Sequence, residues 1–114
     1  MSRAVLAAVT SDCDFDALIA GASLALVTFT GARCIICRQL APMLATVLAE
    51  AGAALASAKV DVDVVPALTK RFAIRSLPTT LLFRDGVAAD RLSGFATAGR
   101  LRDWLGSHGV TCGL

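Results

Sequence analysis

Apolar residues in this chain fall in short blocks that follow two different periods. Residues 23–29, SLALVTF, form an apolar run of the kind found in strands covered on both faces. Between residues 36 and 51 the apolar positions recur every three or four residues, which predicts an amphipathic helix that ends at Gly52. Residues 55–62 predict a second buried strand. The two strands and the helix between them form a βαβ unit with parallel strands.

Shorter blocks lie on either side of this unit. Residues 4–9 predict a short strand, after which Asp12 or Asp14 can cap a brief helix that ends near Gly21. Residues 64–72 predict another short helix, whose first turn tolerates the proline that it contains.

The C-terminal third of the chain predicts a hairpin and a last helix. The blocks at 79–83 and 87–94 are joined through Asp85 and Gly86, a pair typical of tight turns, so these two strands are antiparallel. A helix over residues 97–106, capped by a threonine, follows, and we expect a loose tail after it. The blocks together predict an α/β fold with a central mixed five-stranded sheet flanked by four helices.

Length and composition narrow the class of protein. With 114 residues the chain fits one domain, residues 1–114, with an ordinary core. A net charge of +2 and an aromatic content of 5% argue against nucleic acid binding. No apolar run reaches the roughly 18–20 uninterrupted residues of a membrane-spanning helix, and polar residues end the first apolar run too early for a signal peptide. We therefore expect a cytoplasmic monomer that binds no membrane.

Two cysteines lie three positions apart at the predicted start of the long helix, in the stretch GARCIICRQLAP. Free backbone N–H groups and the positive end of the helix dipole favour a thiolate over a thiol at Cys34. Arg33 and Arg38 add positive potential if their side chains approach the sulfur. Cys37, nearly one turn further on, can attack a mixed disulfide on Cys34 and release the reduced partner. The pattern indicates a redox pair in which Cys34 is the exposed nucleophile.

Other uses of the cysteines fit the sequence less well. A structural zinc site needs four ligands, and the only histidine, His108, lies in the predicted tail, where we expect it to face solvent. A purely structural Cys34–Cys37 disulfide would close a short loop that constrains the unfolded chain little. We interpret Cys13 and Cys112 as plain thiols; a disulfide between them, or an intermolecular one through Cys112, is the alternative.

A CxxC pair in a βαβ context is typical of thioredoxin-like proteins, and the chain resembles the thioredoxin family over most of its length. The resemblance rests on the stretches LVTFTGARCIICRQLAPML, AKVDVDVVPALTKRFAIRSLPTTLLFRDG and LSGFATAGRLRDWL. It implies the thioredoxin fold and a thiol–disulfide oxidoreductase that exchanges electrons with protein disulfides. It further implies that Cys34 is the nucleophile, that Cys37 resolves, that an electron donor such as a thioredoxin reductase is a partner, and that no bound cofactor is needed.

The resemblance also assigns residues to substrate binding. It implies a cis peptide bond at Pro78, in SLPTT, beside the cysteines, where the Leu77 backbone is presented to an extended substrate segment. It implies that Gly94 lets the substrate chain approach closely from the other side. Around Cys34 we expect an apolar rim that docks a protein substrate. This rim consists of Ile35, Ile36, Leu77 and Phe95.

The active-site motif departs from the thioredoxin pattern. The family usually has Trp before the first cysteine and Gly-Pro between the two, where this chain has Arg33, Ile35 and Ile36. Because proline lacks an N–H group, the Ile36 amide is an additional donor that can reach the Cys34 sulfur. We expect it to stabilise the thiolate and to make the couple more oxidising.

A second departure concerns the residues beneath the cysteines. The family has a buried aspartate six residues before the nucleophile, where this chain has Thr28, which cannot act as a base near pH 7. Lys59, which matches the family's buried lysine, then lacks its carboxylate partner. We expect either that Asp61 pairs with Lys59 and relays the proton, or that the Lys59 ammonium extends to solvent.

Two other functions stay open on the sequence alone. The altered motif and the apolar rim also fit a thioredoxin-fold binding or scaffold module with weak redox activity. Alternatively, two chains that each contribute Cys34 and Cys37 could hold an iron–sulfur cluster. A disulfide-reduction assay separates the scaffold from the enzyme, and visible absorbance would reveal the cluster.

Overall fold

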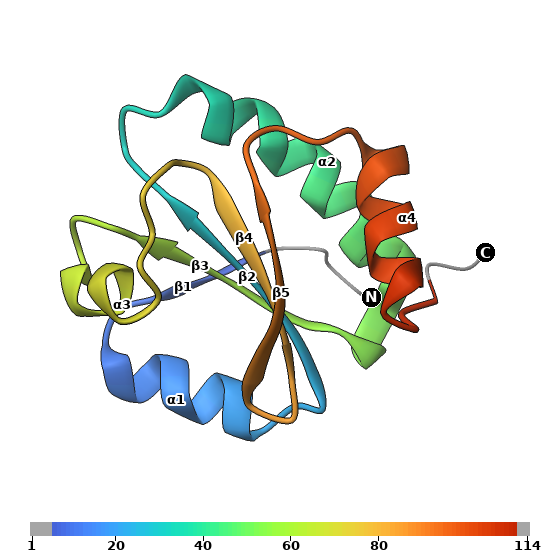
Figure 1. The fold of residues 1–114 in the computed structure, drawn as a ribbon, viewed down its shortest axis with the longest axis horizontal. Coiled ribbons are helices and arrows are strands. Elements are labelled where there is room, and N and C mark those ends of the chain that lie inside the picture. The colour runs from blue at the N-terminus through green and yellow to red at the C-terminus, as the bar shows by residue number, and fades with distance from the viewer. Residues whose placement is uncertain (1–5, 112–114) are drawn as a thin grey trace.

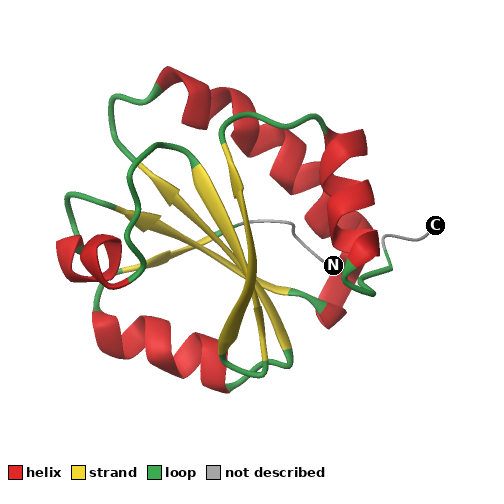
Figure 2. Ribbon diagram, viewed as in Figure 1, coloured by secondary structure: helices red, strands yellow, loops and turns green. Residues whose placement is uncertain are grey.

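The computed structural model describes residues 6–111 and confirms the predicted mixed sheet with helices on both faces (Figures 1 and 2). The strands are β1 (Ala7–Val9), β2 (Leu24–Thr30), β3 (Ala56–Asp61), β4 (Thr79–Arg84) and β5 (Val87–Ser93). The helices are α1 (Asp12–Ala20), α2 (Ile35–Ala51), α3 (Pro66–Arg71) and α4 (Ala98–Ser107), with a 3₁₀ turn, η1 (Gly52–Ala54), directly after α2.

The sheet has the strand order β1-β3-β2-β4-β5. Strands β1 and β2 both run parallel to β3, whereas β4 runs antiparallel to β2 and to β5. The predicted βαβ unit and hairpin are therefore confirmed. In the hairpin turn Asp85 and Gly86 both have positive φ angles, 53° and 82°, which these residue types tolerate. Because β2 is the central strand, the loop that leaves its carboxyl end lies midway along that edge of the sheet.

Each face of the sheet carries its own apolar core. Helices α1 and α3 cover one face, where Phe15, Phe72 and Phe83 pack with ring centroids 5.4 Å apart. Helices α2 and α4 cover the opposite face (Figure 1). Their leucines pack on Leu26 and Leu82 of the central strands. The central strand is thus buried from both sides, as its apolar run predicts.

Helix α2 together with η1, Ile35–Ala54, is long enough and apolar enough by composition to cross a bilayer. This segment was not predicted to span a membrane, because polar residues interrupt its apolar run. Its buried side chains, which include Leu40, Leu44 and Leu48, pack instead in the core formed with the sheet and α4. These core contacts account for the apolar character of α2.

Two expectations for the ends of the fold are wrong. Helix α1 is capped by Ser11, whose Oγ accepts a hydrogen bond from the Asp14 N–H group at 3.1 Å, rather than by Asp12 or Asp14 themselves. The chain after α4 is not loose up to residue 111, because Val110 is buried and its N–H group donates to the Leu105 carbonyl at 3.0 Å. Cys112 lies outside the described residues.

His108 is also placed differently from the expectation of a solvent-facing residue. Its Nε2 lies 2.7 Å from Asp90 Oδ2, and the same oxygen accepts a hydrogen bond from Trp104 Nε1 at 2.9 Å. These contacts, first that of His108 and then that of Trp104, hold the pKa of the Asp90 carboxyl below its ordinary value. The segment after α4 is thereby fastened to β5.

Candidate active site

The cysteine pair lies where β2 ends and α2 begins. A turn follows β2, and its Cys34 N–H group donates to the Gly31 carbonyl at 3.2 Å. Cys34 is the N-cap of α2, with extended backbone angles, and its Sγ accepts a hydrogen bond from the Cys37 N–H group at 3.1 Å. The side chain of Cys34 thus occupies the position at which helix starts hold polar or negatively charged atoms.

Cys34 and Cys37 are joined by a disulfide bond, with their Cα atoms 5.2 Å apart. Cys34 is partly exposed, whereas Cys37 is buried, with 8% of its surface accessible. In this disulfide form the donor to the Cys34 sulfur is the Cys37 N–H group, and the expected hydrogen bond from the Ile36 amide to the Cys34 thiolate stays a prediction. An N-cap side chain commonly accepts from the third helical residue, and here that residue is Cys37.

The loop before β4 completes the surface around Cys34. The Leu77–Pro78 peptide bond is cis, as predicted, and Leu77 lines the same surface cavity as Cys34 and Arg33. Gly94, at the end of β5, has a φ of 82° and donates its N–H group to the Pro78 carbonyl at 2.8 Å. Two segments far apart in the sequence are therefore linked beside the cysteine loop.

Gly31 is a site residue that the sequence reasoning missed. A Cβ atom at this position would lie 3.1 Å from Leu77 Cδ1, closer than most such contacts allow. Its absence lets the Leu77 side chain approach the loop that carries Cys34. The available signal was a glycine placed directly between a buried strand and the CxxC pair.

Three of the four predicted rim residues are large apolar side chains exposed to solvent. Ile35 is 65% exposed, Ile36 43% and Phe95 46%, whereas Leu77 is only partly exposed. Val64 is also a large apolar side chain exposed to solvent, at 58%, and it was not among the predicted rim residues. Large apolar side chains left in water next to a reactive group are typical of a surface that another molecule covers.

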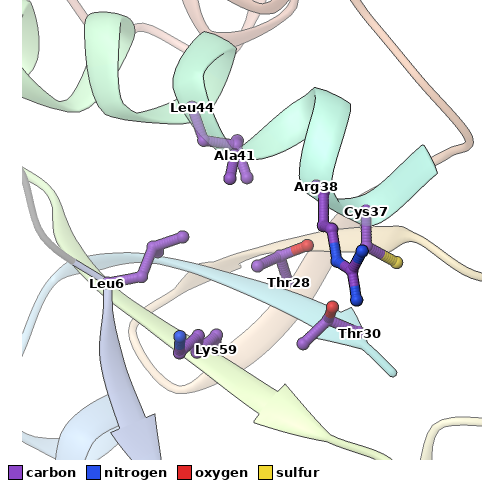
Figure 3. Close-up of a pocket in the computed structure, with 8 residues that line it drawn as sticks. All are labelled: Leu6, Thr28, Thr30, Cys37, Arg38, Ala41, Leu44 and Lys59. Carbon is purple, nitrogen blue, oxygen red and sulfur yellow. The ribbon is translucent and has the colours of Figure 1, made fainter. Parts of the chain in front are cut away.

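The buried side of the pair faces a different environment. Cys37 lines a cavity together with Thr28 and Thr30 of β2, Arg38 of α2 and Lys59 of β3 (Figure 3). In Figure 3, Arg38 and Cys37 extend from α2 toward the sheet, and the two threonines lie beneath them. Arg38 is held there by a hydrogen bond from Nη2 to the Ala32 carbonyl, 3.1 Å long.

The expected partnership between Lys59 and Asp61 is not formed. Lys59 is exposed, as in the alternative expectation, and neither residue belongs to an ion pair within residues 6–111. Asp61 lines a neighbouring cavity with Lys59, not the one that contains Cys37. Its Oδ1 instead accepts a hydrogen bond from the Asp63 N–H group at 2.8 Å. This local contact stabilises the turn after β3.

The comparisons with known proteins agree with this site. The thioredoxin family model matches residues 6–107. The chain belongs to the thioredoxin family. It is similar to the thioredoxin of Mycolicibacterium smegmatis, with 38% identity over 89 residues, which cover 76% of this chain and 80% of the relative. It is also similar to the thioredoxin of Staphylococcus aureus, with 31% identity over 98 residues, which cover 86% of this chain and 93% of the relative.

Solved thioredoxin structures have the same fold. The oxidised thioredoxin of Plasmodium falciparum superposes with a TM-score of 0.82 at 29% identity, covering 91% of this chain and 98% of that chain. The thioredoxin of Malassezia sympodialis superposes with a TM-score of 0.84 at 24% identity, covering 95% of this chain and 94% of that chain. At this identity the comparison supports only the shared fold. As a member of the thioredoxin family, the protein is a thiol–disulfide oxidoreductase; proteins of this family act on protein disulfides and are themselves reduced by a reductase.

Proposed function

We propose that the two cysteines divide the oxidoreductase reaction between them, with Cys34 attacking the substrate disulfide and Cys37 resolving the product. The observation that carries this assignment is the difference in access at the start of α2. Cys34 is partly exposed and lines a surface cavity, whereas Cys37 is buried. A bulky protein disulfide can reach the first sulfur and not the second.

In the reduced protein the reaction has two exchange steps. The Cys34 thiolate attacks one sulfur of the substrate disulfide, forms a mixed disulfide and releases the other substrate sulfur as a thiolate. The Cys37 thiolate then attacks the Cys34 sulfur, forms the Cys34–Cys37 disulfide and releases the second substrate thiolate. Two electrons pass from the cysteine pair to the substrate, and the pair is left in the oxidised form seen here.

The exposed apolar side chains around Cys34 serve as the docking surface in this proposal. Ile35, Ile36 and Phe95 supply apolar contact area, which favours a protein segment over a small polar thiol. Leu77 and Pro78 present backbone to the segment, as an added strand would require, and the positive φ of Gly94 supports the adjoining turn.

The charged and hydroxyl groups near the pair tune its reactivity. Arg33 lies in the cavity of Cys34 and Arg38 in that of Cys37, so each sulfur has one guanidinium nearby that favours its thiolate. Thr28 and Lys59 act on the Cys37 side. Asp61 lines the adjoining cavity and forms no ion pair with Lys59, so it has no part in this tuning.

For the cellular setting we propose a monomer in the cytoplasm, with a thioredoxin reductase as electron donor. The small net charge of +2 favours neither nucleic acid nor an anionic membrane surface as a partner. Size-exclusion chromatography with light scattering tests the oligomeric state, and NADPH oxidation coupled to a purified reductase tests the donor.

Trapping the mixed disulfide tests the division of roles. In a background of Cys13→Ser and Cys112→Ser, the Cys37→Ser variant should form a stable adduct with insulin through Cys34, measurable by intact-mass spectrometry after acid quenching. The Cys34→Ser variant should form none. Equal adduct formation by the two variants would contradict the assignment, and failure of the unmodified pair to reduce insulin would favour a scaffold role. A brown protein with visible absorbance would favour the iron–sulfur dimer.

A further inference from the structure

The cavity on the Cys37 side is lined by cations and hydroxyl groups that form and break no bond in the exchange steps. Its volume is about 170 Å³, several times the roughly 30 Å³ that one water molecule occupies in the liquid. Its polar lining comes from three elements, with Cys37 and Arg38 on α2, Thr28 and Thr30 on β2, and Lys59 on β3 (Figure 3). The remaining lining residues are Leu6, Ala41 and Leu44.

No carboxylate within the part of the chain that the structure describes neutralises the positive charge in this cavity. Arg38 and Lys59 both line it, and no carboxylate is among its lining residues. Neither cation forms an ion pair within residues 6–111. The hydrogen bond from Arg38 to the Ala32 carbonyl places the guanidinium without compensating its charge. Asp61, the nearest candidate along β3, lines the adjoining cavity and already accepts a hydrogen bond from Asp63.

A buried hydroxyl pair adds an unused donor. Thr28 is 5% exposed and Thr80 1% exposed, and their Oγ1 atoms lie 3.3 Å apart in a hydrogen bond. Two hydroxyl groups hold two protons, and this bond uses one of them. The other proton has no acceptor among the hydrogen bonds of the described residues. Of the two hydroxyls, that of Thr28 lines the cavity, so an acceptor placed there would complete the pair.

We infer that this cavity binds a small free carboxylate, of the size of formate or acetate. Such an anion would accept hydrogen bonds from the Thr28 and Thr30 hydroxyls and offset the charges of Arg38 and Lys59. Charge-assisted hydrogen bonds of this type are stronger than those between neutral groups. A water molecule would satisfy the hydroxyls, whereas an anion would in addition pair with the two exposed cations. The site lies beside the buried Cys37 side chain, which lines the same cavity.

The chain offers a direct spectroscopic probe, because its sequence contains only two lysines, Lys59 and Lys70. Lysine labelled with ¹³C at Cε would give one side-chain signal pair in the cavity and one on the exposed surface of α3. The full-length oxidised protein is titrated with sodium acetate, and in parallel with sodium chloride at equal ionic strength. We expect a saturable shift of the Lys59 signals with acetate, little change with chloride, and no saturable change at Lys70.

Variants separate the site from general surface binding. Lys59→Gln should weaken acetate binding by about tenfold or more, since it removes one of two charged donors, whereas Lys59→Arg should retain it. Binding to the Gln variant is followed through the backbone amides of Thr28 and Thr30. The matched control Lys70→Gln should bind acetate like the unmodified protein. Thr28→Asp should abolish the acetate response, because it places a carboxylate of the chain itself in the cavity.

The outcomes are unambiguous even if Thr28→Asp fails to fold, because the Lys59 variants alter an exposed side chain. Equal shifts with acetate and chloride, shifts that do not saturate, or unchanged acetate affinity in Lys59→Gln would each overturn the inference. The titration uses the disulfide form and no substrate. Its result is therefore independent of whether Cys34 and Cys37 have the proposed roles.

Discussion

The two sulfurs of the disulfide, although bonded to each other, lie in opposite environments. The cavity that contains Cys34 opens to the surface between the cysteine loop and the loop of Leu77, and large apolar side chains are exposed nearby. The cavity that contains Cys37 lies between α2 and the sheet and is lined by two cations and two hydroxyls. One side is suited to contact with a protein and the other to contact with a small anion.

This difference follows from where α2 begins. The N-cap position leaves the Cys34 side chain at the open end of the helix, whereas Cys37, nearly one turn later, points back toward the sheet. A spacing of three residues thus suffices to place one sulfur in reach of substrate and the other beneath the surface. The fold need supply only a buried central strand that delivers the chain to this point.

The largest effect is expected from removing the exposed sulfur. Cys34→Ser should lower multiple-turnover reduction of insulin by at least about 10³-fold, the scale on which loss of a nucleophile acts. Circular dichroism should show an unchanged fold. Cys13→Ser is the matched control, since Cys13 is an exposed free thiol, and it should keep full activity. Activity retained by Cys34→Ser would remove the distinction between the two sides.

Enlarging the cavity that contains Cys37 should lower the free energy of unfolding. Leu44 lines that cavity and is 1% exposed in the core between α2, α4 and the sheet. Leu44→Ala should lower the free energy of unfolding by about 2–5 kcal/mol, as burial is lost and a larger cavity remains. Urea denaturation measures it. A loss below about 1 kcal/mol would mean that this side collapses easily and is not a preformed cavity.

Shortening an exposed apolar side chain beside Cys34 should weaken binding of a protein substrate and leave the free energy of unfolding nearly unchanged. Ile35→Ser removes a side chain that is 65% exposed, so the free energy of unfolding should change by no more than about 0.5 kcal/mol. The KM for a protein disulfide should rise several-fold, because apolar contact area is lost. The rate with a small aromatic disulfide should change little. Equal effects on both substrates would argue against an apolar docking surface.

The smallest effect on stability is expected from the cluster of Asp90, Trp104 and His108, which lines neither the cavity of Cys34 nor that of Cys37. The contact with His108, and then that with Trp104, lowers the pKa of Asp90, so the folded state favours the ionised carboxylate. The resulting stabilisation is present above the ordinary carboxyl pKa of 3.8 and is lost as pH falls through the lowered value. Because the side chain is 41% exposed, we expect at most about 1 kcal/mol.

Urea midpoints measured from pH 7 to pH 2 check this prediction. The difference between the unmodified protein and Asp90→Asn should shrink at acid pH. Asp103→Asn, an exposed substitution on α4, is the control. A difference that grows on acidification would show that Asp90 prefers to be protonated in the folded state.

Patterns in the sequence were sufficient for the fold. The apolar run of β2, the helical spacing after Cys34 and the Asp85–Gly86 turn each specify a local structure, and the mixed sheet follows from their order. The cap of α1 was misplaced because Ser11 and the aspartates after it have side chains of nearly equal capping ability. Which one caps depends on where β1 releases the chain, and local residue types do not encode this.

The site was less fully predictable, for reasons of three-dimensional contact. Position in the helix identified both cysteines, and resemblance identified the cis bond at Pro78. The exposure of Lys59 could not be read from a strand pattern, because it depends on what the neighbouring strand and α2 leave uncovered. His108 looked free because its partner, Asp90, is 18 residues away in the chain.

Thiol alkylation of the reduced protein measures the difference in reactivity between Cys34 and Cys37 without any substrate. In a background of Cys13→Ser and Cys112→Ser, the rate of iodoacetamide reaction at Cys34 is measured at neutral pH, beside that of an unstructured cysteine peptide. We expect Cys34 to react faster than the peptide and faster than Cys37, which should stay unmodified until Cys34 is consumed. A Cys34 rate no greater than that of the peptide, or preferential alkylation of Cys37, would contradict this expectation.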